Sequence, residues 1–208
     1  PKERFQAFLE MLIELDSGMQ WYSFCRCEYM DDKTARLMKK SGCIAVLLGL
    51  ESGNDQQLNR MNKQVTVQKL RETHRLYQEH GIVTIGFFVI GFPGETDQSL
   101  EDTVHFIEDC HPDFYRLHVW ECETSTRIWE SRQSVGLTLK NGVWCHSTMN
   151  MKQATQHIAT IQTRIQNSVS IDKADFSFAL QMLNHGHSLE EVKKLYRYLN
   201  VVDGKGPL

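Results

Sequence analysis

The 208-residue sequence lacks any long apolar run. Its two longest, 44–50 and 82–92, are far shorter than the roughly 18 to 20 residues that a membrane helix needs, and no signal-peptide pattern opens the chain. It also lacks a strong excess of charge of one sign, since the net charge is −3 and Lys and Arg are scattered among acidic residues. We therefore expect no membrane contact and no direct nucleic-acid partner, and a small molecule is the expected substrate.

Metal-binding cysteine motifs are missing as well. The six cysteines have irregular spacings, and the closest pair, Cys25 and Cys27, is separated by one residue, whereas zinc and iron–sulfur sites usually use C-x₂-C or longer spacings. The sequence thus predicts no metal ligands in this chain, and its thiols are expected to be reduced, small hydrophobic groups of a cytoplasmic protein. HExxH, GxGxxG, Walker A and GxSxG motifs do not occur either.

Hydrophobic periodicity predicts alternating strands and helices over the first 141 residues. Expected strands are 21–27, 43–50, 82–91 and 114–120, and expected helices are 4–15, 32–41, 55–61, 67–80 and 97–110. Strand–helix repeats imply right-handed crossovers and a parallel sheet, with no antiparallel strand. Beyond this, segments 151–168, 172–183 and 188–199 have helical patterns, with a turn at Ser170. We expect an α/β domain at 1–141 and a helical C-terminal appendage at 142–208.

Two glycine-containing turns follow buried strands and mark the candidate site: GLESG at 49–53 and VIGFPGET at 89–96. The carboxyl ends of parallel strands are where such folds place their ligands. Alternation puts Gly49 and Glu51 on one face of their strand, and Val89 and Gly91 on one face of theirs. A flat ligand can approach the backbone there if the glycine faces are interior.

Glu51 at a strand end can bond a sugar hydroxyl or an amino group, and Ser52 adds a hydroxyl. The simpler alternative is that Glu51 caps the following turn and Gly53 supplies a positive φ.

Arg26 on the first expected strand can hold a carboxylate or a ribose, or it pairs with Glu28 or Asp31 at the surface. The segment WCHSTM (144–149) either lines a pocket mouth or contains a core tryptophan followed by a capping Ser or Thr.

The runs GCIAVLLGLESG, RMNK and GIVTIGFFVIGFPGET, in this order and spacing, resemble the radical S-adenosylmethionine (radical SAM) superfamily. They resemble in particular the branch whose members often carry an N-terminal cobalamin-binding domain, and the match covers roughly residues 1–130. The resemblance implies a partial TIM-type (β/α) barrel, with about four of its six parallel strands in this chain. It also implies that SAM binds beside a 4Fe-4S cluster and is cleaved reductively to a 5′-deoxyadenosyl radical.

Carried over to this sequence, the resemblance places Glu51 and Ser52 at the ribose or methionine end of SAM and Arg26 at another polar group. Val89 and Gly91 would line the adenine. It assigns no catalytic residue. A departure is CETST (122–126), where the branch often has a Pro-Gly-Thr turn.

The main departure is that the CxxxCxxC cluster loop of the superfamily does not occur in these 208 residues. We therefore expect the chain, which begins at Pro1, to be the C-terminal part of a longer enzyme. The complete enzyme would perform methyl transfer or ring modification, and its cluster ligands and cobalamin domain would lie outside this chain. The chain alone would be inactive.

Two alternatives stay open. One is a degenerate radical SAM-like scaffold that docks a partner, and the other is a different α/β enzyme, such as a hydrolase or an aldolase-like barrel piece. The second needs a nucleophile or base near Glu51, and none is evident in the sequence. An open sheet also has exposed edges, so a homodimer through the first strand is expected.

Overall fold

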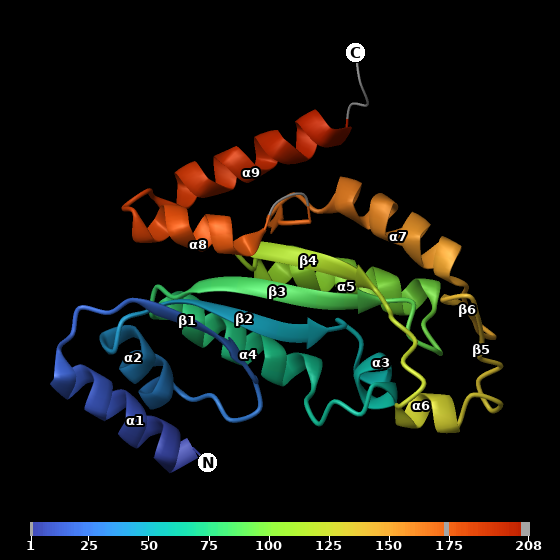
Figure 1. Ribbon diagram of the computed structural model, residues 1–208, viewed down its shortest axis with the longest axis horizontal. Coiled ribbons are helices and arrows are strands. Elements are labelled where there is room, and N and C mark those ends of the chain that lie inside the picture. The colour runs from blue at the N-terminus through green and yellow to red at the C-terminus, as the bar shows by residue number, and fades with distance from the viewer. Residues whose placement is uncertain (1, 173–174, 205–208) are drawn as a thin grey trace.

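The computed structural model describes residues 2–172 and 175–204, with side chains to Val201. It contains one five-stranded parallel sheet in the order β1-β2-β3-β4-β7 and a separate antiparallel hairpin of β5 and β6 (Figure 1). The strands are β1 (Trp21–Cys25), β2 (Cys43–Glu51), β3 (Val83–Ile90), β4 (Phe114–Val119), β5 (Thr138–Lys140), β6 (Val143–Cys145) and β7 (Val169–Ser170). The helices are α1 (Lys2–Leu15), α2 (Asp32–Lys40), α3 (Asp55–Arg60), α4 (Val67–Glu79), α5 (Asp97–Cys110), α6 (Arg127–Glu130), α7 (Met151–Arg164), α8 (Phe176–Asn184) and α9 (Leu189–Gly204).

Side-chain caps set the starts of the crossover helices. Asp31, Asn54, Thr66 and Thr96 each accept a hydrogen bond from a backbone N–H in the first turn of α2, α3, α4 and α5. Such a bond satisfies one of the N–H groups that a helix start leaves without an intrahelical partner. The predicted strands and helices of the first 120 residues are therefore confirmed to within a few residues at their ends.

Both faces of β2 are covered by helices. The outer face carries Val46, Leu48 and Leu50, which belong to the core formed with α2, α4 and α5. The inner face carries Ala45 and Leu47, which pack in a second core with α8 and α9. Figure 1 shows α8 and α9 on the opposite side of the sheet from α2 and α4. This sandwich explains why the β2 sequence is apolar at nearly every position.

The second core covers the inner face only toward the amino ends of the strands. Ile85 of β3 and Phe114 of β4 are fully buried there, and Tyr196 of α9 packs its ring 5.7 Å from that of Phe114. Gly49 and Val89, nearer the carboxyl ends, are only half-buried. The two C-terminal helices thus leave the carboxyl end of the inner face open.

Three expectations about the second half of the chain are corrected. The hairpin of β5 and β6 is antiparallel, and β7 adds a fifth strand at 169–170, where a turn was expected. A strand of two residues is too short to show alternation, so the sequence does not predict β7. The helix expected at 172–183 begins only at Phe176, after the cap Asp175, while residues 173–174 lie outside the described residues. α7 also contacts β3, β4 and β6.

The free edge of β1 is the other boundary of the sheet. Within the described residues β1 pairs only with β2, and Tyr22 and Phe24 on it are 46% and 70% exposed. No helix in the described ranges combines the length and apolar character that crossing a membrane requires.

The buried His74 makes the stability of this fold sensitive to acid. Its ring is 1% exposed, its Nε2 lies 3.0 Å from Thr84 Oγ1, and burial lowers its pKa to about 4. An unfolded histidine titrates near 6.5, so the unfolded chain takes up the proton first as the pH falls. We expect this residue to reduce the free energy of unfolding by about 3 kcal/mol between pH 6.5 and pH 4.

Urea unfolding of wild type and His74→Asn across that pH range measures the effect. The variant should show a shallower loss of stability on acidification, whereas His185→Asn, on the exposed turn after α8, should follow the wild type. Equal slopes for wild type and His74→Asn would contradict the assignment.

Candidate functional site at the carboxyl ends of the strands

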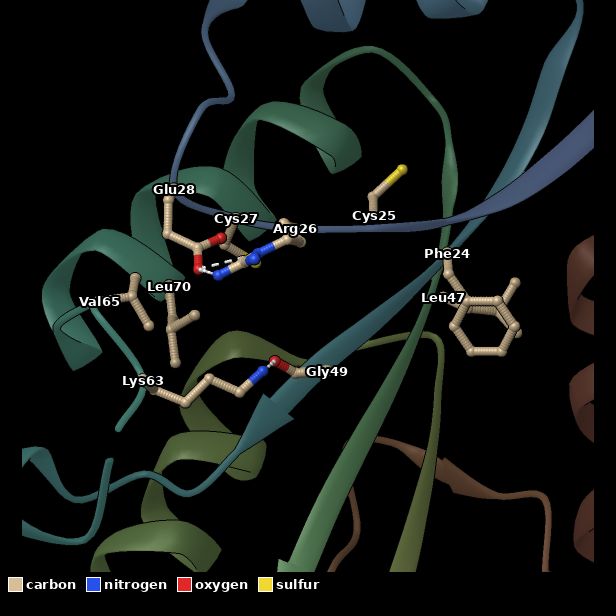
Figure 2. A pocket seen from close by; sticks show the side chains of 10 residues that line it. All are labelled: Phe24, Cys25, Arg26, Cys27, Glu28, Leu47, Gly49, Lys63, Val65 and Leu70. Carbon is tan, nitrogen blue, oxygen red and sulfur yellow. Dashed lines mark hydrogen bonds and ion pairs between the residues drawn. The ribbon is translucent and has the colours of Figure 1, made fainter. Parts of the chain in front are cut away.

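A cavity of about 210 Å³ opens at the carboxyl ends of β1 and β2. It is lined from three directions by the end of β1, the end of β2 and the segment that leads into α4 (Figure 2). Its lining residues are Phe24, Cys25, Arg26, Cys27, Glu28, Leu47, Gly49, Lys63, Val65 and Leu70. The hollow lies at the edge of the sheet where the sequence predicted the ligand, but Arg26 alone among the predicted site residues lines it.

Lys63 joins the end of β2 to this cavity. Its Nζ lies 2.8 Å from Glu51 Oε1 and donates to the carbonyl oxygen of Gly49 at 3.3 Å. Figure 2 shows the lysine side chain extended toward Gly49. A Cβ at Gly49 would lie 2.7 Å from Glu51 Oε1 and 3.3 Å from Nζ, so a larger residue there would push the ends of these two side chains aside.

Glu51 itself adopts the left-handed conformation, with φ of 63°. This corrects the expectation that Gly53 supplies the positive φ, because Gly53 has none. A glycine is needed at 53 for another reason: a Cβ there would lie 2.5 Å from the carbonyl oxygen of Asp102 in α5. A non-glycine residue at positive φ is uncommon, and here Lys63 holds it in place.

Ser52 lies away from the cavity. Its side chain is fully buried between β2 and α5, and its hydroxyl is 3.3 Å from Thr103 Oγ1. The same hydroxyl accepts a hydrogen bond from the N–H of Asn54 at 3.2 Å. Ser52 therefore shapes the turn after β2 from beneath, and a direct contact with a ligand stays a prediction.

Arg26 forms the surface pair that the sequence left as one alternative. Its Nη2 lies 2.8 Å from Glu28 Oε1, and 71% of its side chain is exposed. The exposed guanidinium and the less exposed carboxylate both face the cavity mouth (Figure 2). The pair leaves the guanidinium accessible to a further anionic or hydroxyl group.

Val89 and Gly91 lie at the end of β3. Val89 faces the inner side next to His118 of β4, and it is half-buried. Gly91 has a φ of +91°, and a Cβ on it would come within 2.6 Å of the Trp144 ring and 2.8 Å of Ala154. The structure brings Glu51 and Val89 to neighbouring strand ends, whereas Gly91 is buried under Trp144. Trp144 is a core tryptophan, as the second interpretation of WCHSTM predicted, but the cap of the following helix is Asn150 and not Ser147 or Thr148.

Glu95 is an important residue of this region for which the sequence motifs predicted no role. It is 1% exposed, its Oε2 accepts a hydrogen bond from the N–H of Gly91 at 2.5 Å, and its Oε1 is buried with no hydrogen-bond partner in the described part of the chain. Burial raises its pKa to about 7. The available signal was an acid placed directly after the Pro-Gly turn that follows an apolar strand.

The short segment RMNK ties the two turns together. Arg60 Nη1 donates to the carbonyl oxygen of Gly94 at 2.7 Å, and Lys63 binds Glu51 and Gly49 as described above. The segment from the end of α3 into the following loop thus holds the turn after β3 through Arg60 and the turn after β2 through Lys63. The sequence showed the motif, but its two contacts could not be predicted.

Aromatic rings form the inner wall between the cavity and α8. The ring of Phe87 stacks on His118 at 5.8 Å and lies 6.0 Å from Phe24. Burial, and then the charge of Arg116, lower the pKa of His118, so this half-buried ring is neutral at pH 7. The inner face therefore offers flat apolar surface beside the charged groups at the strand ends.

The side chains at the ends of the strands suit a polar organic ligand. Glu51 can accept hydroxyl or ammonium protons, Arg26 can bind a carboxylate, and Val89 and Phe87 offer apolar contact. Across residues 2–172 and 175–204, no group of three or more His, Cys, Asp or Glu side chains converges as a metal site would require.

Comparison with known families and structures agrees with this geometry. The family model described as "Radical SAM superfamily" matches residues 2–107, which is half of the chain. This chain belongs to the radical SAM superfamily.

A Pyrococcus horikoshii protein named an uncharacterized methyltransferase is 28% identical over 163 residues, covering 78% of this chain and 35% of the relative. The anaerobic magnesium-protoporphyrin IX monomethyl ester cyclase of Rubrivivax gelatinosus is 33% identical over 114 residues, covering 54% of this chain and 20% of the relative. This radical SAM chain thus spans about a third or less of these two proteins.

A solved structure supports the fold. The radical SAM methyltransferase TsrM from Kitasatospora setae, with cobalamin and a [4Fe-4S] cluster bound, superimposes with a TM-score of 0.68 at 15% identity, covering 93% of this chain and 49% of that one. The predicted family and α/β barrel-type fold with a helical C-terminal part are confirmed.

Proposed function

We propose that this radical SAM chain binds the nucleoside part of S-adenosylmethionine at the carboxyl ends of β2 and β3, as part of a longer cobalamin-dependent enzyme. That enzyme would transfer a methyl group to, or modify a ring of, a small-molecule substrate. The observation that carries the proposal is the Glu51 carboxylate, held by Lys63, which itself lines the hollow together with Gly49. The names of the relatives and of TsrM support the reaction class.

Each residue has a distinct role in the proposed site. Glu51 accepts hydrogen bonds from the ribose hydroxyls or the amino group, and Arg26 binds a carboxylate or other polar group. Val89 contacts the adenine from the inner face, while Gly91 sets the path of the backbone beside it. Ser52 supports the turn that carries Glu51. Bound beside a reduced iron–sulfur cluster, SAM supplies the radical chemistry of the family.

The ligands of the 4Fe-4S cluster are proposed to lie outside these 208 residues. The sequence has no CxxxCxxC, and the described residues hold no converging set of three metal ligands. By itself the chain is then unable to perform radical chemistry. We retain the boundary between a barrel part at 1–141 and a helical part at 142–208 as a proposal, with the addition that β7 of the second part joins the sheet.

The cysteines favour a reducing compartment, because all six are free. We propose the cytoplasm, which fractionation of the producing cells followed by immunoblotting tests.

The first test of the proposed function is a titration of the 208-residue chain with SAM, followed by ¹H–¹⁵N NMR. Shifts should gather at the ends of β2 and β3, with weak affinity because the cluster that anchors the amino-acid end is missing. Glu51→Gln should weaken binding about tenfold, since a charge-assisted hydrogen bond becomes a neutral one.

The control is Glu72→Gln, on α4, whose carboxylate bonds Gln68 on its own helix. It should bind SAM as the wild type does. Equal affinities for wild type and Glu51→Gln, or shifts confined to other parts of the chain, would contradict the site.

Iron and sulfide reconstitution tests the location of the cluster. The isolated chain should show no stoichiometric 4Fe-4S absorbance, whereas a longer protein that includes a CxxxCxxC upstream of Pro1 should show it. Stoichiometric assembly on the 208 residues would overturn the proposal, and an upstream sequence without CxxxCxxC would favour the non-catalytic scaffold.

For the isolated chain we also propose pairing of two copies through the free edge of β1, where Tyr22 and Phe24 are exposed. Light scattering at high concentration should give the mass of a dimer. A monomer mass, or a dimer unaffected by Phe24→Lys, would argue against this interface.

A further inference from the structure

One histidine holds the start of the turn that follows β3 directly and its end through Thr148. The Gly91 carbonyl oxygen lies 3.0 Å from His146 Nε2. At the other end of the turn, the Gly94 N–H donates to Thr148 Oγ1 at 3.2 Å, and this hydroxyl is 3.2 Å from His146 Nδ1. Neither Gly91 nor Gly94 belongs to a strand, so side-chain contacts rather than hydrogen bonds between strands hold this backbone.

The surrounding donors define which ring nitrogen of His146 carries the proton. The backbone N–H of Met149 donates to Nδ1 at 3.2 Å, so Nδ1 acts as an acceptor and has no proton. The Nε2–H is then the donor to the Gly91 carbonyl oxygen. Burial lowers the pKa of His146, which agrees with a neutral ring.

Packing fixes the plane of the ring. His146 is 5% exposed and stacks on Trp144, with centroids 5.1 Å apart and an angle of 7° between the planes. The indole N–H of Trp144 donates to the carbonyl oxygen of Trp120, just beyond β4, at 2.7 Å. The indole on which the imidazole stacks is therefore itself fixed, and rotation of the imidazole would lose this stacking.

The backbone N–H of Gly91 is held by Glu95, whose carboxylate accepts its hydrogen bond. Both backbone polar groups of Gly91 are thus bound by side chains that are themselves buried, and these two side chains fix the position of Gly91 at the start of the turn. Neither His146 nor Glu95 lines the cavity at the ends of β1 and β2.

We infer that His146 is a positioning residue for the SAM site: it sets the backbone at the end of β3, beside which the adenine is proposed to bind, by donating from Nε2 to the Gly91 carbonyl. The inference rests on the proposed function for the identity of the ligand. The contacts of His146 with the turn stand independently of it.

Three variants of the 208-residue chain test the inference. His146→Phe keeps a flat ring on Trp144 but has no donor, His146→Gln places an amide N–H near the position of Nε2, and His146→Asn carries a shorter amide. The control is His185→Phe, on the exposed turn between α8 and α9.

The first readout needs no ligand. In the wild type, imidazole ¹⁵N NMR should show the neutral Nε2–H tautomer for His146. The Gly91 and Gly94 amide resonances should shift in His146→Phe and return toward the wild type in His146→Gln. An Nδ1–H tautomer, or unchanged Gly91 and Gly94 resonances in His146→Phe, would overturn the assignment.

The second readout is the dissociation constant for SAM from the same spectra. His146→Phe should weaken binding about tenfold, as expected for a lost positioning hydrogen bond, and His146→Gln should recover most of it. A merely structural role predicts equal losses for Phe and Gln, and wild-type affinity in a folded His146→Phe contradicts the inference. If His146→Phe does not fold, His146→Asn decides, because its amide falls short of the Gly91 carbonyl.

The two proposals fail in different ways. Absence of SAM binding by the wild type would contradict the proposed function and with it the ligand role of His146. A wild type that binds SAM at the ends of β2 and β3, with equal affinity in His146→Phe, would contradict only the positioning role.

Discussion

Burial of β2 on both faces is the constraint on which the rest of this structure depends. Leu48 and Leu50 face the outer helices, and Leu47 faces α8 and α9, each with no exposed surface. A strand that is apolar on both sides must be sandwiched, because each exposed leucine would forgo about 1.5 to 3 kcal/mol of burial energy. This requirement places helices on both sides of the sheet and leaves only the strand ends for polar groups.

At one of those ends a residue with a strained backbone conformation carries a carboxylate. Glu51 stands in the left-handed region, and the cost of that conformation for a non-glycine residue is on the order of 1 to 2 kcal/mol. The ion pair with Lys63, only partly exposed, and the free space over Gly49 hold it there. Strained residues that surrounding contacts hold in place are typical of binding sites. Glu51 is such a residue, and it lies at the end of β2, which α8 and α9 leave uncovered.

Remote segments complete the site. Arg60, at the end of α3, and Lys63, in the loop that follows, reach two different strand ends, while Glu95 and His146 bind the N–H and the carbonyl group of Gly91. The hairpin of β5 and β6 is therefore connected to the proposed nucleoside site, although it follows the residues matched by the family model. The part of the chain beyond residue 141 contributes to the sheet, to the inner core and to the fixation of the β3 turn.

The sequence by itself determined the parallel sheet of β1 to β4, its crossover helices and the position of the candidate site. Period-2 and period-3.6 patterns, capping residues and glycine-containing turns are local signals, and the three motifs that indicated the radical SAM family lie in this part. Only the tertiary structure decided that Ser52 lies under α5, that Arg26 pairs with Glu28, and that Lys63 rather than Gly53 supports the turn at Glu51. Ser52 meets Thr103, and His146 meets Gly91, across more than 50 residues of chain, whereas Lys63 meets Glu51 across a loop. Periodicity does not encode such contacts or a strand as short as β7, and it left two possible partners for Arg26.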